Sequence, residues 1–131
     1  MTSRYNVAIL GASGLVGQRL QELLYDHPLF DVVAIAGSPN SVGLMHEEIE
    51  WRLDSRRPNY DILICSMSDI PDVDIAFSAL PNNVAEVVEP SLVARGIHVF
   101  SNASTFRRIA GIPLVIPEVN PEDMRSYDGH A

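Results

Sequence analysis

The sequence predicts an α/β fold, in which one domain spanning residues 1–131 holds a doubly wound, mainly parallel sheet. Short apolar runs recur along the chain with turn residues around them. The runs are continuous and do not alternate with polar residues, which is typical of strands buried on both faces of a parallel sheet. Segments with helical spacing separate several of them, and this order favours right-handed crossovers.

The composition indicates a single soluble globular domain. Of the 131 residues, 47% are hydrophobic and 20% are charged, which is enough apolar material to build a core without covalent staples. The formal net charge is -8 at pH 7. Sequence-independent binding to nucleic acid or to an anionic membrane needs clustered positive charge, so we expect neither partner.

Two residue types are scarce enough to exclude classes of site. All nine basic residues are arginine, and the lack of lysine excludes a Schiff-base lysine and the lysine of a nucleoside-triphosphate loop. The single cysteine, Cys65, excludes a disulfide framework and a metal site built from several cysteines. The first apolar stretch, residues 7–10, is too short for a signal peptide or a membrane span, which favours a cytoplasmic protein.

Six apolar runs predict the strands. They are residues 5–10, 32–36, 62–65, 74–80, 97–101 and 114–116. The run at 62–65 is expected to add an edge strand after residues 37–59, the least regular part of the pattern. Within that part, residues 47–53 are a candidate helix around Trp51.

Two helices are predicted between these runs. The first covers residues 15–25 and ends at 26–28, where Pro28 follows. The second covers residues 84–95, with Gly96 in the position favoured for a left-handed cap. Pro90 lies inside it and is expected to kink or divide the helix.

The spacing in the first helix predicts which of its faces is buried. Apolar side chains fall near helical spacing and are expected to face the sheet, while polar side chains take the other face. The apolar set is Leu15, Val16, Leu20, Leu23 and Leu24, and the polar set is Gln18, Arg19, Gln21 and Glu22.

The turn between the first strand and the first helix is the most informative part of the sequence. Residues 11–17 carry glycine at 11, 14 and 17. Glycine permits a tight turn and a close approach of backbone to ligand, and the helix N-terminus then presents free amides to a pyrophosphate. This pattern predicts a dinucleotide-binding site of the Rossmann type, although the glycines also fit a turn that only packs helix on sheet. Ser13 is either a helix cap or a phosphate donor.

The end of the second strand bears on the choice of coenzyme. An acidic residue there would hold both ribose hydroxyls of NAD and repel the 2′-phosphate of NADP. Residues 37–43 contain no carboxylate, and Ser38, Asn40 and Ser41 can donate hydrogen bonds to a phosphate. The segment favours NADP over NAD, and an ordinary polar turn is the alternative.

Cysteine and histidine give no catalytic or metal site in this pattern. Cys65 ends an apolar run, and an apolar site raises the pKa of a thiol, so we interpret it as a buried strand residue. The four histidines are scattered without ligand spacing. We therefore expect no metal and assign no catalytic residue.

Four strings together resemble a known family. They are residues 11–17 (GASGLVG), 77–81 (FSALP), 101–104 (SNAS) and 115–121 (VIPEVNP). In this order and spacing the chain resembles the N-terminal coenzyme-binding domain of aspartate-β-semialdehyde dehydrogenase of the archaeal and fungal type, and malonyl-CoA reductase is similar in the same way.

The resemblance implies the reduction of an acyl phosphate to an aldehyde with NADPH in amino-acid biosynthesis. The family uses a cysteine nucleophile and a histidine acid/base. Both are expected in a catalytic and dimerisation domain beyond residue 131, so this chain by itself is expected to be inactive. An apolar surface beside residues 115–117 is expected to be left for a weak homodimer or a separate catalytic chain.

The resemblance also implies the coenzyme contacts. They fall on Gly11, Ala12, Ser13, Gly14, Leu15, Val16, Ser38, Ser41, Ala79, Leu80 and Pro81. Asn102 and Ser104 match the segment near the nicotinamide. Asn40 and Leu44 stand where relatives often have arginine and lysine, which implies a weaker hold on the 2′-phosphate.

Arg107 matches the arginine that holds the substrate's phosphate group. A planar guanidinium makes paired, charge-assisted hydrogen bonds to an oxyanion. An exposed, solvated pair of Arg107 and Arg108 is the alternative. For the chain as a whole, the alternatives are a standalone nucleotide-binding or interaction module and the coenzyme half of a malonyl-CoA reductase or of a split enzyme.

Overall fold

The computed structural model describes residues 4–103, 112–115 and 117–131. Its sheet has four parallel strands in the order β2-β1-β3-β4, formed by β1 (Tyr5–Leu10), β2 (Phe30–Ala36), β3 (Ile75–Ser78) and β4 (His98–Ser101). Helix α1 (Leu15–Leu24) connects β1 to β2, and α2 (Asn82–Ala94) connects β3 to β4. The predicted doubly wound α/β fold is confirmed.

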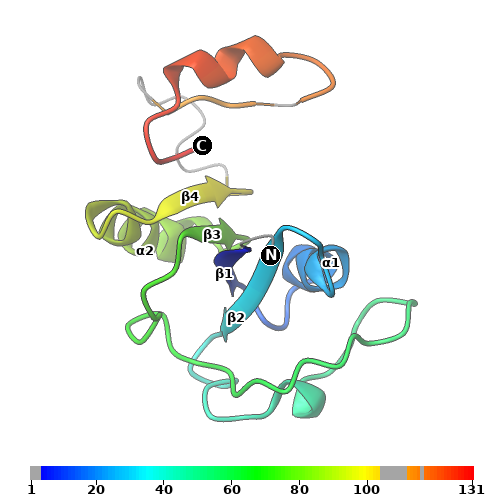
Figure 1. Ribbon diagram of the computed structural model, residues 1–131. Helices are drawn as coiled ribbons and strands as arrows, with labels where there is room; N and C mark the ends of the chain where they lie inside the picture. The colour runs from blue at the N-terminus through cyan, green and yellow to red at the C-terminus, as the bar shows by residue number, and fades with distance from the viewer. Residues whose placement is uncertain (1–3, 104–111, 116) are drawn as a thin grey trace.

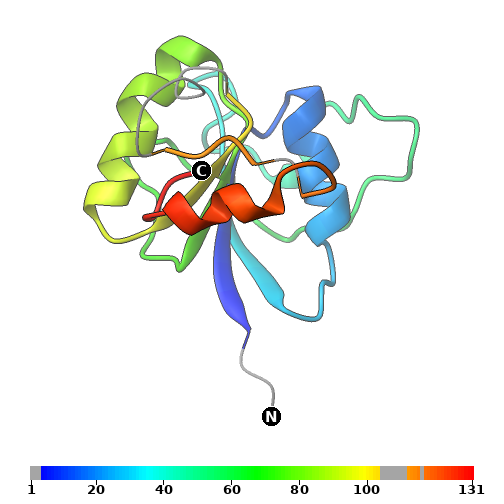
Figure 2. The same ribbon diagram turned by 90° about the horizontal axis from the view of Figure 1, so that it is seen from above.

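The two helices cover opposite faces of the sheet (Figures 1 and 2). On the α2 side, Ala85 and Leu92 pack with Ala8 and Leu10 of β1. On the α1 side, Leu24 packs with β1 side chains that point the other way. Because residues 7–10 of β1 are buried on both faces, this part of the strand is continuously apolar. The strand order reverses between β1 and β3, and ligands of open α/β sheets bind at the carboxyl ends of strands at such a point.

Helix α2 ends as its glycine predicts and is continuous across its proline. The amide of Gly96, whose φ is +83°, donates to the Val93 carbonyl, and the amide of Ile97 donates to that of Leu92. These two bonds form a Schellman cap. Pro90 removes one backbone donor, but the helix is not divided, because its apolar side is held against the sheet by buried residues such as Leu92.

The predicted buried face of α1 is largely wrong. Leu24 is buried as expected, but Leu15 and Leu23 are 53% and 59% exposed, whereas Gln18 and Gln21 are fully buried. The physical reason is tertiary, because residues 46–60 lie against the polar side of the helix and bond to it. The Tyr60 hydroxyl, for example, donates to the Gln21 carbonyl at 2.6 Å. Buried amides are tolerated where both ends find partners.

Three of the other predicted elements are shorter or less regular than expected. In place of the candidate helix at residues 47–53, only a 3-10 turn forms, η1 (His46–Glu48), which overlaps its first two residues. Residues 62–65 make isolated bridges, Ala36 with Cys65 and Met45 with Leu63, because neither side offers enough consecutive partners for a strand. Residues 114 and 115 are irregular, and residue 116 lies outside the described residues.

The described C-terminal residues return to the sheet. After the 3-10 helix η2 (Pro121–Ser126), the amide of Ala131 donates to the Val99 carbonyl, and the amide of Val99 donates to the Gly129 carbonyl, both at 2.8 Å. His130 Nε2 lies 2.7 Å from Glu89 Oε1 beneath α2. None of the helices in the described parts of the chain is long and apolar enough to cross a membrane.

Candidate functional site

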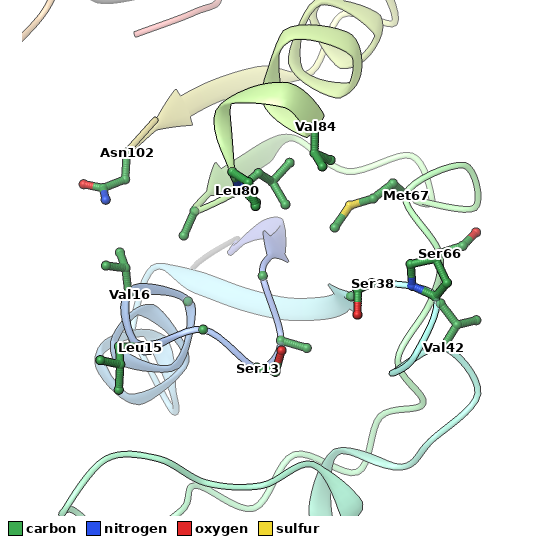
Figure 3. A pocket seen from close by; sticks show the side chains of 18 of the residues that line it. Ser13, Leu15, Val16, Ser38, Val42, Ser66, Met67, Leu80, Val84 and Asn102 are labelled. Carbon is green, nitrogen blue, oxygen red and sulfur yellow. The ribbon is translucent and has the colours of Figure 1, made fainter. Parts of the chain in front are cut away.

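A cavity of about 1070 Å³ opens at the carboxyl ends of the strands. Its walls come from the turn after β1, the segment after β2, the loop at 66–68, the turn after β3 and the residue after β4. In Figure 3, Asn102 and the start of α1 lie at one side of the cavity and Ser38 lies at the other, with Leu80 and Ser13 between the two sides. This volume suits a ligand of dinucleotide size.

Most of the predicted coenzyme contacts line this cavity. They are Gly11, Ala12, Ser13, Gly14, Leu15, Val16, Ser38, Ala79, Leu80, Pro81 and Asn102. Ser41 is not among the lining residues, because it is buried and its Cβ lies against Gly37. Ser104 and Arg107 lie outside the described residues.

The glycine turn, residues 11–17, is tightly held where it meets the sheet. Gly11 has a φ of +122°, and a Cβ there would meet the Ala79 carbonyl oxygen at 2.9 Å. Its amide donates to the Ala36 carbonyl, while the Ala79 amide donates to the Leu10 carbonyl. The turn is therefore fixed between the strand ends on either side of β1.

The start of α1 is open toward the cavity. Gly14 is the N-cap residue, and a Cβ built on it would meet no atom within 4 Å. The first amides of the helix have no intrahelical partner, so a ligand that approaches here finds free donors and the positive end of the helix dipole. Ser13 is not the N-cap residue and makes no cap bond, so its interpretation as a helix cap is wrong.

Two carbonyl oxygens of the glycine turn accept hydrogen bonds from a buried side chain of α1. Gln21 Nε2 donates to the carbonyls of Gly11 and Ala12, each at 3.1 Å. Gln21 Oε1 in turn accepts a bond of 2.7 Å from His46 Nε2. This buried network keeps acceptor groups away from the cavity and leaves the donors facing it.

The far end of the cavity follows β2. Gly37 fits closely there, since a Cβ would lie 2.8 Å from Ile64 Cγ2. Ser38, Pro39 and Val42 line the wall, and no described lining residue is acidic. Asn40 is exposed and Leu44 packs into the core, and neither lines the cavity.

Arg52 also lines the cavity, which the sequence does not predict. It lies in the irregular segment after η1, fourteen positions beyond Ser38. No motif links the two, and only the path of residues 46–60 along α1 brings the arginine to the glycine turn. The other missed lining residues, Ser66, Met67 and Ser68, follow the isolated bridge at Cys65.

Cys65 has no place in the cavity lining. It is half-buried rather than buried, and its amide donates to the Ile35 carbonyl at 3.0 Å. Burial raises the pKa of its thiol, with a smaller effect from Asp69. A thiol in this state is a poor nucleophile at neutral pH, which agrees with the structural interpretation of this residue.

Comparison with known proteins identifies the family. A family model described as the NAD-binding domain of semialdehyde dehydrogenase matches residues 6–127. The chain belongs to this family. The resemblance to semialdehyde dehydrogenases that the four sequence strings indicate is therefore confirmed.

Individual relatives of this semialdehyde dehydrogenase domain support the same family assignment. Aspartate-semialdehyde dehydrogenase of Archaeoglobus fulgidus is 43% identical over 125 residues, which cover 92% of this chain and 36% of that protein. The NADP-type malonyl-CoA reductase of Metallosphaera sedula is 36% identical, with 98% and 37% covered. The crystal structure of the Candida albicans aspartate-semialdehyde dehydrogenase with NADP superposes with a TM-score of 0.88 at 36% identity, covering 94% of this chain and 36% of that one. This chain thus spans about a third of the length of these relatives.

Proposed function

We propose that this semialdehyde dehydrogenase domain binds NADP(H) in the cavity at the glycine turn, as the coenzyme-binding part of an enzyme that reduces an acyl phosphate to an aldehyde. The observation that supports this most directly is the open space in front of Gly14 at the N-terminus of α1. A pyrophosphate that rests there meets the unbonded first amides of the helix. The NADP in the related Candida structure and the lack of an acid after β2 favour NADP over NAD.

Each end of the cavity has a distinct role in this proposal. The adenosine end lies at Ser38 and the nicotinamide end lies at Asn102. The backbone amide of Asn102 donates to the Ser78 carbonyl at 2.8 Å. Leu15 and Val16, exposed on α1, and Leu80 across from them offer apolar contacts to the rings and exclude water. When bound, NADPH supplies the hydride, and this chain orients it.

A substitution at Gly14 tests the binding site. We expect Gly14→Val to abolish NADP binding, because the side chain fills the space that the pyrophosphate needs. The fold should survive, since φ at Gly14 is -79° and its surroundings are open. Calorimetric titration measures binding, and Ser91→Val on the exposed side of α2 is the matched control. No heat from the unaltered chain with either NADP or NAD at millimolar concentration would refute the proposal.

We further infer that this chain shows no dehydrogenase activity by itself. Hydride transfer to an acyl group needs a nucleophile that holds the acyl group against the nicotinamide, and Cys65 lies outside the cavity lining. Reduction of an acyl phosphate by the purified chain with NADPH, lost in Cys65→Ser, would contradict this. For the whole enzyme, aspartyl phosphate fits the proposed reduction of an acyl phosphate, and malonyl-CoA, an acyl thioester, belongs to the alternative in which this chain is the coenzyme half of a malonyl-CoA reductase.

Exposed apolar side chains in the C-terminal part support the proposal that this chain associates with a partner. Leu114 and Val119 are 50% and 72% exposed, and the net charge of -8 opposes indiscriminate clumping. We expect light scattering to show a weak, concentration-dependent dimer, or a monomer that gains a partner when a catalytic domain is supplied. A chain that stays monomeric at millimolar concentration and does not bind an added catalytic domain would argue against both the homodimer and the complex. A standalone nucleotide-binding module is the alternative function that this last result would favour.

A further inference from the structure

The cavity contains one ionisable side chain among its described lining residues. That residue is Arg52, and the rest of the lining is apolar or carries hydroxyl and amide groups. A dinucleotide phosphate is strongly anionic, so a lone guanidinium in an acid-free lining is the strongest local electrostatic feature of the site.

The backbone beside Arg52 is fixed to the first turns of α1. The Arg52 amide donates to Gln18 Oε1, and Gln18 Nε2 donates to the Glu50 carbonyl, each at 2.7 Å. Gln18 itself is fully buried. One side chain therefore clamps residues 50–52 to the helix that carries the glycine turn, and this sets where the arginine begins.

The guanidinium of Arg52 is not used to hold the fold together. Other arginines are: Arg95 pairs with Asp72 at 3.0 Å, and Arg57 donates to the carbonyls of His46 and Ile49. Within the described parts of the chain, Arg52 is exposed and makes no ion pair. Its charge is available to a ligand.

Of the phosphates of NADP, the 2′-phosphate is the one for which the described cavity lining offers neither a helix N-terminus nor another positively charged group. The pyrophosphate already meets the free amides at the start of α1. The ribose lies beyond the end of β2, where Ser38 supplies a hydroxyl, and neither Asn40 nor Leu44 lines the cavity. Arg52 lines the same cavity, and a guanidinium can form paired, charge-assisted bonds to phosphate oxygens.

We propose that Arg52, together with Ser38, binds the 2′-phosphate of NADP and selects NADP over NAD in this chain. The proposal rests on the proposed function, because it concerns a residue of the same cavity. In this proposal the positive charge for the 2′-phosphate comes from Arg52 in the irregular segment over α1. The family resemblance instead implies cationic side chains at positions 40 and 44, after β2.

The test compares Arg52→Gln with Arg56→Gln. Arg56 is exposed and four residues away, and it does not line the cavity, so both variants lose one charge but only one loses the contact. Titration of each full chain with NADP and with NAD gives both affinities. We expect Arg52→Gln to weaken NADP binding about tenfold and leave NAD binding unchanged, since one bond to a charged group contributes this much. Arg52→Lys should recover part of the loss, and Arg56→Gln should match the unaltered chain.

The possible failures are distinguishable. An unchanged ratio of NADP to NAD affinity in Arg52→Gln, or an equal loss for both, would overturn the assignment, and an equal loss would place the guanidinium on the pyrophosphate instead. Binding of neither coenzyme to the unaltered chain would overturn the proposed function first, and this inference with it. Thermal unfolding of each variant is measured as a control, because a variant that unfolds at the same temperature as the unaltered chain has lost affinity without losing its fold.

Discussion

Gly17 faces the carbonyl oxygen of Gly11 so closely that a Cβ built on Gly17 would lie 1.9 Å from that oxygen. The last glycine of the turn therefore lets α1 pack closely against the end of β1. The obstacle is backbone, which cannot swing away as the tip of a flexible side chain can. The first and last glycines of the turn thus form one contact.

This contact predicts a large cost for Gly17→Ala. We expect the free energy of unfolding to fall by more than about 2 kcal/mol, because helix or turn must shift to admit the methyl group. Urea unfolding measures it. Gly14→Ala is the matched control, since its Cβ meets nothing within 4 Å. Equal stability of the two variants would contradict the close packing.

The buried ring of His46 predicts a pH dependence of stability. Burial, with a smaller effect from Arg57, lowers the pKa of His46 from 6.5 to about 4. Between these values the unfolded chain binds a proton that the folded chain does not. The contribution is therefore fully present above pH 6.5 and is lost as the pH falls toward 4, by about 2–3 kcal/mol.

Unfolding free energies between pH 4 and 7 check this prediction. In His46→Gln the slope in this window should flatten, because the replacement amide can still donate to Gln21 without titrating. His98→Gln, at an exposed histidine of β4, controls for the loss of a histidine. A slope unchanged in His46→Gln would show that other groups produce the pH dependence.

The raised pKa of Cys65 predicts a slow thiol. We expect a disulfide reagent at pH 7 to modify it more slowly than a free model thiol, and the rate to rise when the chain is unfolded in urea. Cys65→Ser should leave NADP binding unchanged. Fast modification of the folded chain, slowed by bound NADP, would instead place this thiol in the coenzyme cavity.

The parts of the molecule determined by local sequence could be predicted from it. Continuous apolar runs give β1 and β3 because strands of a parallel sheet are buried on both faces. Gly96 gives the end of α2 because its left-handed φ is costly for other residues. The same constraint applies to Gly11, whose φ is +122°, and the residues of the glycine turn line the cavity as the family resemblance implies.

Tertiary structure alone decided which side of α1 is buried and which cation reaches the cavity. Helical spacing counts apolar side chains, so it turns Leu23 inward and Gln18 outward. In the fold, Gln18 is buried because its amide is satisfied at both ends by the backbone of residues 50 and 52, and Leu23 is left exposed. Hydrogen bonds between segments far apart in the sequence carry no periodic signal. For this physical reason, no sequence motif predicts that Arg52 lines the cavity.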